Sequence, residues 1–302
     1  MEGLSVIRIG VDLGGSKIEI IALRADGHEL LRRRLPTPAG DYGATLGAVV
    51  GMIKAAEDDL GESGSIGIGT PGAISRVTGL LKNANSTCLN GRRVREDLQE
   101  LLGREVRIAN DANCFALSEA TDGSGSGAEV VFGVILGTGV GGGIVVSGRV
   151  ISGVNGIAGE WGHNPLPMPR AEDFPLAECY CGRMGCIETY LSGPSMARLH
   201  KLATGSSLAP PAIVAAAASG DREAEHTVSL YEERLARSLA NVINILDPDV
   251  LVLGGGMSNI GRLYQNIPRL WERHVFSDRV DTKLARHHHG DSGGVRGAAW
   301  LW

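Results

Sequence analysis

The stretch Gly10-Val11-Asp12-Leu13-Gly14-Gly15-Ser16-Lys17 decides how the chain is interpreted. An apolar strand at residues 6–13 precedes its glycines, and a β-branched segment at residues 18–23 follows them. The glycines therefore form the turn of a β-hairpin, whereas P-loops and dinucleotide-binding loops need a helix at this point. Backbone N–H groups of such a turn, together with Lys17, can hold a phosphate. Taken alone, the stretch is explained equally well as an ordinary glycine-rich hairpin.

The same pattern recurs 123 positions later, where Gly10 to Gly14 is matched by Gly133-Val134-Ile135-Leu136-Gly137. A glycine turn follows at residues 137–143, and a strand leaves it at residues 144–146. Two copies of strand, glycine turn and strand predict a duplicated architecture with facing hairpins. Two facing turns can hold a polyphosphate from both sides. Only the first copy carries an acid, Asp12, near which Mg²⁺ can be held through water.

A strand meets a helix in the segment Ile108-Ala109-Asn110-Asp111-Ala112-Asn113. Residues 105–109 alternate like a strand, and residues 112–120 have the composition of a helix. In α/β sheets ligands bind where strands end, so Asp111 is a candidate base for a hydroxyl proton. On this segment alone, capping of the helix by Asn110 or Asp111 is the better interpretation.

A polar loop at residues 82–87 carries two amides, Asn83 and Asn85, and a turn is expected at Asn90-Gly91. Amides suit sugar hydroxyls because each offers both a donor and an acceptor. They suit turns equally well, so the loop alone supports either role.

Three of the five cysteines, Cys179, Cys181 and Cys186, follow His163 in a region rich in proline. Three thiols and an imidazole can form a tetrahedral Cys₃His zinc site that closes a loop without a core of its own. The spacing C-x-C-x₄-C differs from the usual paired C-x-x-C, so unligated thiols stay an alternative. Glu160 and Glu188 flank these residues, and folding around a metal would bring their carboxylates together.

Composition limits the remaining possibilities. The 302 residues are enough for about two domains, and a net charge of −5 gives no electrostatic reason to expect nucleic acid. The first residues lack the features of a signal peptide, and residues 130–146 are too rich in glycine for a membrane span. The odd number of cysteines favours metal binding in a reducing cytoplasm over disulfides, and Cys88 and Cys114 are expected to be buried packing.

Other elements follow from periodicity and from turn residues. The expected helices are residues 44–58, 92–102, 221–246 and 294–302, the last capped by Asp291 or Ser292. Buried strands are expected at residues 65–69 and 249–253. The second of these leads into Gly254-Gly255-Gly256, where backbone can approach a flat ring or ribose. The three histidines near residues 286–289 are expected in a solvated loop.

Together these stretches resemble the ROK family of repressors, open reading frames and sugar kinases. The resemblance spans the chain and rests on D-L-G-G-S-K, N-D-A-N, G-T-G-V-G-G-G, E-W-G-H, C-x-C-G-x-x-G-C-x-E and G-D-S-G-G-V-R-G-A-A. It implies an α/β, duplicated actin/hexokinase-like (ribonuclease H-like) two-domain fold with a cleft between the domains. We expect the first domain at residues 1–117 with a helix at 290–302, and the second at 118–289 with a zinc-binding loop at 159–188.

Within this family the chain is most similar to bacterial fructokinases that also accept mannose, through K-N-A-N-S-T-x-L-N-G and G-E-W-G-H-N-P-L-P. That similarity implies ATP-dependent phosphorylation of the 6-hydroxyl of D-fructose or mannose. The stretch N-D-A-N-C-F-A-L-S-E-A is equally similar to N-acetylglucosamine kinases, so N-acetylglucosamine and glucose are alternatives. Cys88 stands where the fructokinase loop usually has a tryptophan, which leaves the exact sugar open.

The resemblance also implies a role for each site residue. Asp111 is the general base and, with five other residues, binds the sugar: Asn85, Asn110, Glu160, His163 and Glu188. The structural Zn²⁺ is held by His163, Cys179, Cys181 and Cys186. The phosphates of Mg-ATP are held by Asp12, Gly14, Gly15, Ser16 and Lys17, and by Gly137, Thr138, Gly139 and Gly141. Gly254, Gly255 and Gly256 lie against the adenosine, and a cytoplasmic homodimer is implied.

Two other functions are less well supported by the sequence. A sugar-sensing repressor of this family carries a helix-turn-helix domain before the first hairpin, and a strand beginning near Val6 leaves no room for it. A hydrolase that uses the carboxylates of Asp111, Glu160 and Glu188 would not explain two glycine hairpins.

Overall fold

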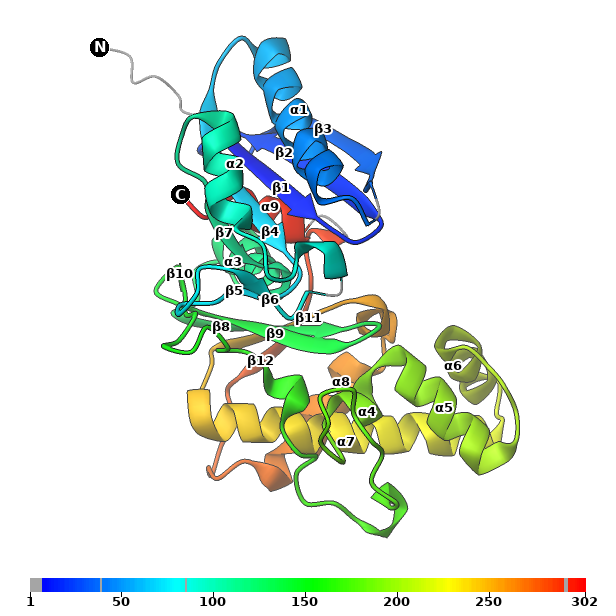
Figure 1. Ribbon diagram of the computed structural model, residues 1–302. Coiled ribbons are helices and arrows are strands. Elements are labelled where there is room, and N and C mark those ends of the chain that lie inside the picture. Colours follow the sequence, from blue (N-terminus) through cyan, green and yellow to red (C-terminus); the bar gives the residue numbers. More distant parts are fainter. Residues whose placement is uncertain (1–6, 39, 85, 291–292) are drawn as a thin grey trace. The chain divides into compact units, whose positions relative to one another are not determined.

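Two five-stranded sheets are each built on one of the glycine hairpins (Figure 1). The computed structural model describes residues 7–38, 40–84, 86–290 and 293–302. The first sheet has the order β3-β2-β1-β4-β7, and its strands are β1 (Ile7–Leu13), β2 (Lys17–Leu23), β3 (Glu29–Pro36), β4 (Gly64–Thr70) and β7 (Arg107–Asn110). The second has the order β10-β9-β8-β11-β12, with β8 (Val130–Leu136), β9 (Val140–Val146), β10 (Arg149–Val150), β11 (Val250–Gly254) and β12 (Lys283–Arg286).

Both sheets follow one plan. Numbered along the chain within each sheet, the strands are ordered third, second, first, fourth and fifth in both cases. The first and second strands form the antiparallel hairpin β1–β2 in one sheet, and β4 pairs parallel to β1 as β11 pairs parallel to β8. This shared order confirms the duplication that the repeated strand and glycine turn predict.

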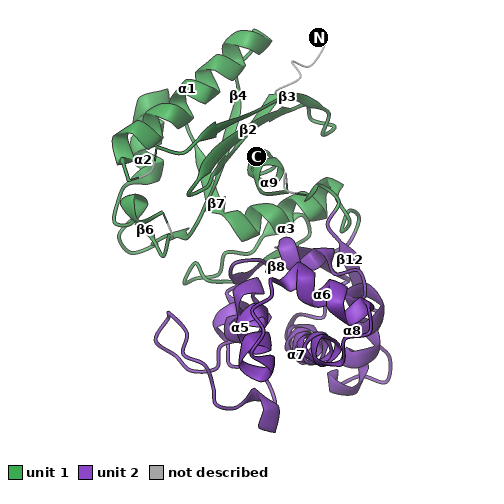
Figure 2. Ribbon diagram, turned by 90° about the vertical axis from the view of Figure 1, so that its right-hand side faces the viewer, with its two compact units in different colours: residues 1–127, 143–158, 288–302 green, residues 128–142, 159–287 purple. Residues whose placement is uncertain are grey.

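The chain divides into two units (Figure 2). Unit 1 comprises residues 1–127, 143–158 and 288–302, and unit 2 comprises residues 128–142 and 159–287. The expected boundary after residue 117 differs from this division. It would cut helix α3 (Asp111–Asp122), which continues five residues further and packs against the last helix.

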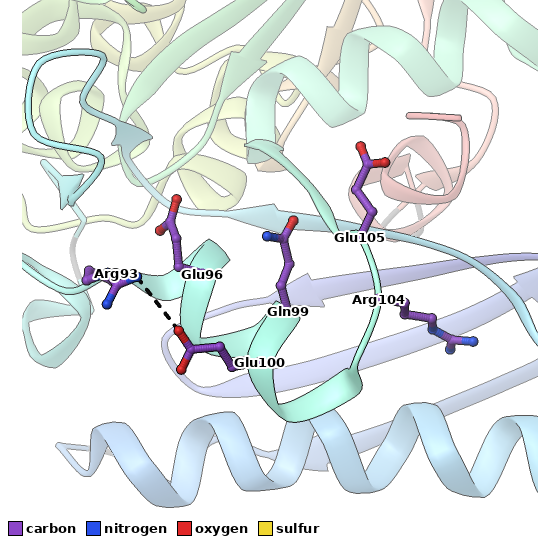
Figure 3. A pocket seen from close by; sticks show the side chains of 6 residues that line it. All are labelled: Arg93, Glu96, Gln99, Glu100, Arg104 and Glu105. Carbon is purple, nitrogen blue, oxygen red and sulfur yellow. Dashed lines mark ion pairs between the residues drawn. The ribbon is translucent and has the colours of Figure 1, made fainter.

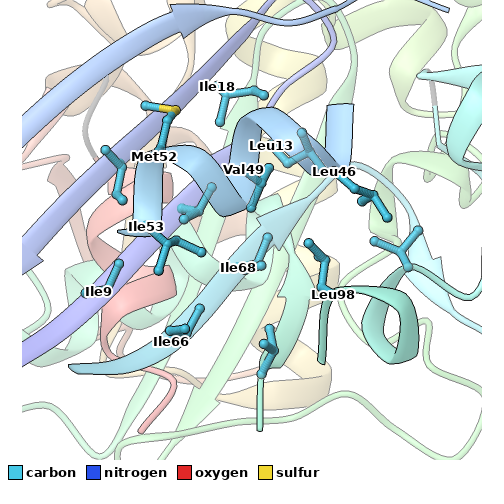
Figure 4. Packing of buried hydrophobic residues seen from close by; sticks show 14 of the residues in the cluster. Ile9, Leu13, Ile18, Leu46, Val49, Met52, Ile53, Ile66, Ile68 and Leu98 are labelled. Carbon is cyan, nitrogen blue, oxygen red and sulfur yellow. The ribbon is translucent and has the colours of Figure 1, made fainter. Parts of the chain in front are cut away.

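In unit 1 the first sheet carries helices on two faces. Apolar side chains of β1 and β4 pack against α1 (Tyr42–Leu60) and α2 (Val94–Leu102), and Figure 4 shows Ile9, Ile68 and Val49 in this core. The other face packs against α3 and α9 (Gly293–Ala299). Helix α1 begins at the N-cap Asp41 and ends at Gly61, whose φ of 67° favours glycine.

Unit 2 is mostly helical outside its strands. Its helices are α4 (Glu188–Leu191), α5 (Gly193–Thr204), α6 (Pro210–Ala218), α7 (Arg222–Leu246) and α8 (Leu263–Trp271). The predicted long helix is α7, capped by Asp221 and ended before Pro248. Leu235, Leu239 and Ile243 of its predicted stripe are buried. Short 3₁₀ turns occur at Thr87–Leu89, Trp161–His163, Ala171–Asp173, Gly256–Asn259 and Glu272–His274.

A short antiparallel pair, β5 (Ala73–Ile74) and β6 (Leu81–Lys82), lies between β4 and α2. The predicted helices and strands are present, with ends shifted by a few residues. Residues 130–146 form β8 and β9, and no helix within the described ranges is long and apolar enough to cross a membrane. The proposed caps Asp291 and Ser292 lie outside the described residues.

The expectation of a solvated loop at residues 286–289 holds in part: residues 287–289 form a loop in which His288 is exposed, but the loop is anchored to a buried carboxylate. Strand β12 extends to Arg286, and the backbone N–H groups of His288 and His289 donate to the carboxylate of Glu119 at 3.0–3.4 Å. Glu119 is fully buried, and a buried carboxylate needs donors. His289 also contacts Asp122 at 2.9 Å through Nε2.

Candidate functional site

The first glycine turn is held by the end of β3. The Gly14 N–H donates to the Lys17 carbonyl at 3.0 Å. Thr37 donates from its backbone N–H to Ser16 O at 3.0 Å and from its hydroxyl to Gly14 O at 2.7 Å. Gly15 and Ser16 are exposed, so a fixed turn presents its backbone to ligand.

Asp12 lies at the end of β1, beside other carboxylates. Burial, followed by the negative charges of Asp111 and Glu19, raises its pKa to about 6 against the opposing positive charges of Lys17 and Arg34. Glu19 is its cross-strand neighbour in β2. Within unit 1 the fold therefore brings two predicted site residues, Asp12 and Asp111, within electrostatic reach of each other.

Lys17 is paired with Glu19, a residue that sequence analysis did not single out. Its Nζ lies 3.9 Å from Glu19 Oε2, and the same oxygen accepts a 2.7 Å bond from Arg34. Arg32 also donates to Glu19, whose side chain is 1% exposed. One buried carboxylate thus holds three cations beside the turn. The lone acid within the apolar run at residues 18–23 was the available signal.

Asn110 and Asp111 occupy the junction of β7 and α3. Asn110 caps the helix by accepting from Ala112 N at 2.9 Å, and its amide donates to Gly72 O at 3.1 Å. The capping interpretation is therefore confirmed for Asn110. Asp111 also accepts from Ala112 N, at 2.8 Å, but its side chain is exposed at the first turn of the helix.

The polar loop before α2 is only partly described, because Asn85 lies outside the described residues. Asn90 both accepts from Ala84 N and donates to Ala84 O, at 2.8 Å each. The predicted turn is present, since Gly91 has a φ of 73°. Asn83 has a positive φ of 61°, a turn conformation that asparagine tolerates.

Cys88 lines a cavity of about 220 Å³ together with Gly14 and Gly15 of the first turn. It is half-buried and packs against the core of unit 1, so the expectation of buried packing holds fully for Cys114 and in part for Cys88. A larger hollow of about 460 Å³ lies on α2 (Figure 3). Its lining includes the ion pair Arg93–Glu100 at 3.8 Å, and none of the predicted site residues lines it.

The second glycine turn, in unit 2, is bound to Glu188. Glu188 Oε2 accepts from Val140 N at 2.8 Å, and a Cβ on Gly139 would come within 2.8 Å of the same oxygen. The Gly137 carbonyl accepts from Gly193 N at 2.8 Å. Thr138 at the tip is exposed. The predicted sugar ligand Glu188 is thus tied to the predicted phosphate turn.

The sequence expects the adenosine at three glycines of unit 2, Gly254, Gly255 and Gly256, of which Gly254 is buried at the end of β11. Gly255 has a φ of 81°, and a Cβ there would come within 2.4 Å of the Leu136 carbonyl at the end of β8. Gly255 and Gly256 are exposed. This packing explains the glycine at residue 255 and leaves an open backbone surface beside the second turn.

The predicted metal ligands lie together. Donor atoms of His163, Cys179, Cys181 and Cys186 are all within 4.8 Å of one another. Cys179 Sγ lies 3.6 Å from His163 Nδ1, and Cys181 Sγ lies 3.6 Å from Cys186 Sγ. Zn–S and Zn–N bonds of about 2.3 and 2.0 Å in a tetrahedron require donor separations of roughly 3.5–3.8 Å. The four donors are therefore of the kinds that zinc prefers, and the two 3.6 Å separations match the spacing of a tetrahedral zinc site.

The thiols of the cluster have unequal environments. Burial, followed by hydrogen bonds from the neighbouring thiols, raises the pKa of Cys186 to about 12, whereas the backbone N–H of Arg183 lowers the pKa of the exposed Cys181. A metal bound there must displace thiol protons, so its binding weakens as the pH falls.

Tyr180 stands beside this cluster and was not predicted. Its hydroxyl lies 3.0 Å from His163 Nε2, and the two rings meet edge to face with centroids 5.2 Å apart. Partial burial of the hydroxyl, followed by the negative charges of Glu188, Cys179 and Glu160, raises the pKa of Tyr180 to about 12. Tyr180 thus connects the thiol cluster electrostatically to two predicted sugar ligands. A tyrosine between two cysteines carries no recognisable sequence signal.

The predicted sugar residues that the structure describes form two sets. Asn110 and Asp111 belong to unit 1, and Glu160, His163 and Glu188 belong to unit 2. Glu160 is exposed, immediately before the turn that carries His163.

A comparison of the sequence with known protein families finds a match to one family. The ROK family model matches residues 8–302. The chain is 44% identical to an N-acetyl-D-glucosamine kinase of Photobacterium profundum over 296 residues, 97% of this chain and 98% of the relative. An N-acetyl-D-glucosamine kinase of Salmonella paratyphi A is 43% identical with the same coverage.

Solved structures are similar over the same length. A ROK hexokinase from Thermus thermophilus has a TM-score of 0.88 at 30% identity, covering 98% of this chain and 97% of that one. A ROK family glucokinase from Streptomyces griseus, in complex with glucose and AMPPNP, has a TM-score of 0.75 at 27% identity and covers 98% of both chains. The expected hexokinase-like α/β fold is confirmed.

The expected closer similarity to fructokinases is not supported. Both curated relatives named above are N-acetyl-D-glucosamine kinases, and N-acetylglucosamine was the alternative sugar. Discrimination between sugars depends on which hydroxyl groups the side chains of the folded site contact, and a short sequence motif does not reveal those contacts.

Proposed function

The chain belongs to the ROK family, and from this premise we propose that it is an ATP-dependent N-acetyl-D-glucosamine kinase. The γ-phosphoryl group of ATP is transferred to the 6-hydroxyl of the sugar. The observation that carries the choice of sugar is 44% identity, over 97% of the chain, to a kinase of that sugar. The chemistry rests on the arrangement of Asp12, Asp111 and the glycine turns.

Asp111 is the proposed general base. Its carboxylate is exposed at the start of α3 and is oriented by the Ala112 N–H at 2.8 Å. Helix N-termini favour the ionised form of a carboxylate. Phosphoryl transfer needs little bond-making from the protein, so a base that aligns the hydroxyl and accepts its proton late is sufficient.

The phosphates of ATP are assigned to the two turns. Gly14, Gly15, Ser16 and Lys17 supply backbone N–H groups and one ammonium, and Gly137, Thr138, Gly139 and Gly141 supply the second turn. Asp12 would hold Mg²⁺ through water, and the metal would neutralise phosphate charge. The neighbouring negative charges of Asp111 and Glu19 suit such a cation. Gly254, Gly255 and Gly256 are assigned to the adenosine.

The sugar is assigned to residues of both sets. Asn85, Asn110 and Asp111 would contact it from unit 1, and Glu160, His163 and Glu188 from unit 2. The bond from Val140 N to Glu188 supports a link between sugar binding and the second phosphate turn, because one carboxylate serves both.

A structural Zn²⁺ is assigned to His163, Cys179, Cys181 and Cys186. When bound, the metal closes the loop between Glu160 and Glu188 and takes no part in phosphoryl transfer. The surrounding loop also has protein support. Asp173 accepts from Arg234 at 2.7 Å and from Arg237 at 3.0 Å, both on α7.

A coupled ADP-release assay with Mg-ATP tests this function. The sugars are N-acetylglucosamine, N-acetylmannosamine, glucose, mannose and fructose. We expect the highest kcat/KM with N-acetylglucosamine. A preference for fructose or mannose would overturn the choice of sugar and keep the mechanism. No sugar-dependent ADP release from folded protein would overturn the kinase assignment.

A further inference from the structure

A row of charged side chains crosses the first sheet beside the first glycine turn. Asp12 of β1 pairs in register with Glu19 of β2, and Glu19 pairs in register with Arg34 of β3. We propose that Arg34 binds the phosphates of ATP as a second cation beside Lys17. This inference rests on the kinase activity of the proposed function, and all of these residues belong to unit 1.

The arginines of β3 lie on different faces of the sheet, because successive side chains of a strand alternate. Arg33 is paired with Asp59 of α1, on one face. Arg32 and Arg34 lie on the opposite face, and both donate to Glu19, Arg32 to Oε1 and Arg34 to Oε2. Of these three arginines, Arg34 is the nearest in sequence to the end of β3 that holds the glycine turn.

Arg34 is fixed at the level of the turn. Its Nε donates to Glu19 Oε2 at 2.7 Å, and the same oxygen lies 3.9 Å from Lys17 Nζ. The side chain of Glu19 is 1% exposed, whereas those of Lys17 and Arg34 are each 44% exposed. One buried carboxylate therefore holds two partly exposed cations side by side. Thr37, which follows β3, ties the strand end to the turn by donating to Gly14 O at 2.7 Å.

The row carries an excess of positive charge. Glu19 is one carboxylate among three cations, and the group stays positive when an ionised Asp12 is included. Burial is the largest influence on the pKa of Asp12 and raises it, and the charges of Lys17 and Arg34 oppose that rise. Both cations thus act on the residue proposed to hold Mg²⁺. The phosphates of Mg-ATP are negatively charged, and a guanidinium that is oriented before binding suits them in charge and in geometry.

The charge of Glu19 does not by itself require Arg34. Glu19 keeps Arg32 on its other oxygen, and Lys17 remains beside it, when Arg34 is replaced. An ion pair with a partner this exposed adds little to stability, because solvent screens it. Arg34→Gln is therefore expected to fold normally, which thermal unfolding checks.

Arg34→Gln in the full chain tests the proposal. The dissociation constant of Mg-AMPPNP, an ATP analogue that is not hydrolysed, is measured by isothermal titration calorimetry. We expect binding about 10–100-fold weaker than in the unmodified protein, the usual effect of losing a hydrogen bond to a charged group. The KM for N-acetylglucosamine should stay unchanged, since Arg34 contacts phosphate and not the sugar.

Arg32→Gln is the matched control, because it removes the same charge from the same carboxylate. Arg32 pairs in register with Ile21, which lies in an apolar cluster with Val295 of α9. Arg32 is thus one step further from the turn than Arg34, and the variant should bind Mg-AMPPNP as tightly as the unmodified protein.

Unchanged affinity in Arg34→Gln would overturn the proposal. Equal losses in Arg34→Gln and Arg32→Gln would also overturn it, because they would show an effect of net charge and not a contact. In both cases the sugar assay still decides the kinase assignment. If the unmodified protein neither binds Mg-AMPPNP nor phosphorylates a sugar, this inference and the proposed function are both wrong.

Discussion

Asp12 shows how one residue of the site influences stability. Its pKa is raised from 3.8 to about 6 by burial and by the charges of Asp111 and Glu19. A carboxyl group whose pKa is higher in the folded state binds its proton more tightly there. The folded state is therefore favoured at low pH and loses stability as the pH rises from about 4 to about 6. A shift of this size corresponds to roughly 3 kcal/mol.

Asp12→Asn is therefore expected to raise the free energy of unfolding at pH 7 by about 1–3 kcal/mol when nucleotide and Mg²⁺ are absent. The gain should shrink as the pH falls from about 6 and vanish near pH 3, where the carboxyl group is protonated in both the folded and the unfolded state. Urea unfolding at the two pH values measures it, with the exposed Asp58→Asn as control. A variant less stable than the unmodified protein at pH 7 would contradict this account. Sugar phosphorylation should fall in the same variant.

Asp111→Asn separates catalysis from helix capping. Asn110 already caps α3, so the variant should fold normally and lose about 10²–10⁴-fold in kcat. Steady-state kinetics and thermal unfolding measure the two effects. Asp41→Asn, at the N-cap of α1, is the control and should leave kcat unchanged. Unchanged kcat in Asp111→Asn would reduce Asp111 to a residue of the helix end.

At the scale of elements, glycines allow α9 to lie close to the first sheet. A Cβ on Gly67 would lie 1.8 Å from the Ala298 carbonyl, and one on Gly10 would lie 2.1 Å from the Val295 carbonyl. On the helix itself, a Cβ on Gly297 would lie 1.6 Å from the Cys114 carbonyl. No side chain fits at these contacts, so the backbones pack directly.

Gly67→Ala should destabilise the protein by about 1–3 kcal/mol or more, because the helix and the strand must separate to admit a methyl group. Gly47→Ala is the matched control. Gly47 lies on the exposed side of α1 with open space around it, so alanine there should stabilise by about 0.5–1 kcal/mol. Chemical denaturation measures both, and equal effects would contradict direct backbone packing.

Elements that are determined by residues close together in the chain could be predicted from the sequence. The hairpin of β1 and β2, the long helix α7 and the cap at Asn110 each depend on residues close together in the chain. The anchoring of the loop at residues 286–289 could not, because its partner Glu119 is 169 positions from His288. The cavity beside Cys88 and the contact of Tyr180 with His163 likewise depend on packing between separated segments.

At the scale of the whole molecule, duplication explains the strand order of the two sheets, but it does not indicate which sugar is bound. Both sheets repeat one strand order, and each carries a glycine turn. The four proposed zinc ligands belong to one unit alone, and the repeated strands did not predict them. The repeated strands also do not indicate which hexose is preferred. The proposal of N-acetylglucosamine rests on the sequence relatives instead.

We expect one zinc ion per chain in purified protein. Metal analysis by mass spectrometry measures it, and Cys186→Ser should reduce the content well below one because a buried ligand is lost. Cys88→Ser is the control, since Cys88 belongs to unit 1 and is not one of the four clustered donors, so this variant should keep a full complement of zinc. Fully active protein without zinc would contradict the assignment.

The central claim is that phosphate from ATP reaches the 6-hydroxyl of N-acetylglucosamine. The most direct test is ¹H–³¹P correlation NMR of the reaction mixture, with ADP measured in parallel. We predict a phosphorus signal coupled to the protons on carbon 6, formed in equal amount to ADP and absent with Asp111→Asn over the same period. ADP formed with inorganic phosphate alone, or phosphate on another carbon, would contradict the claim.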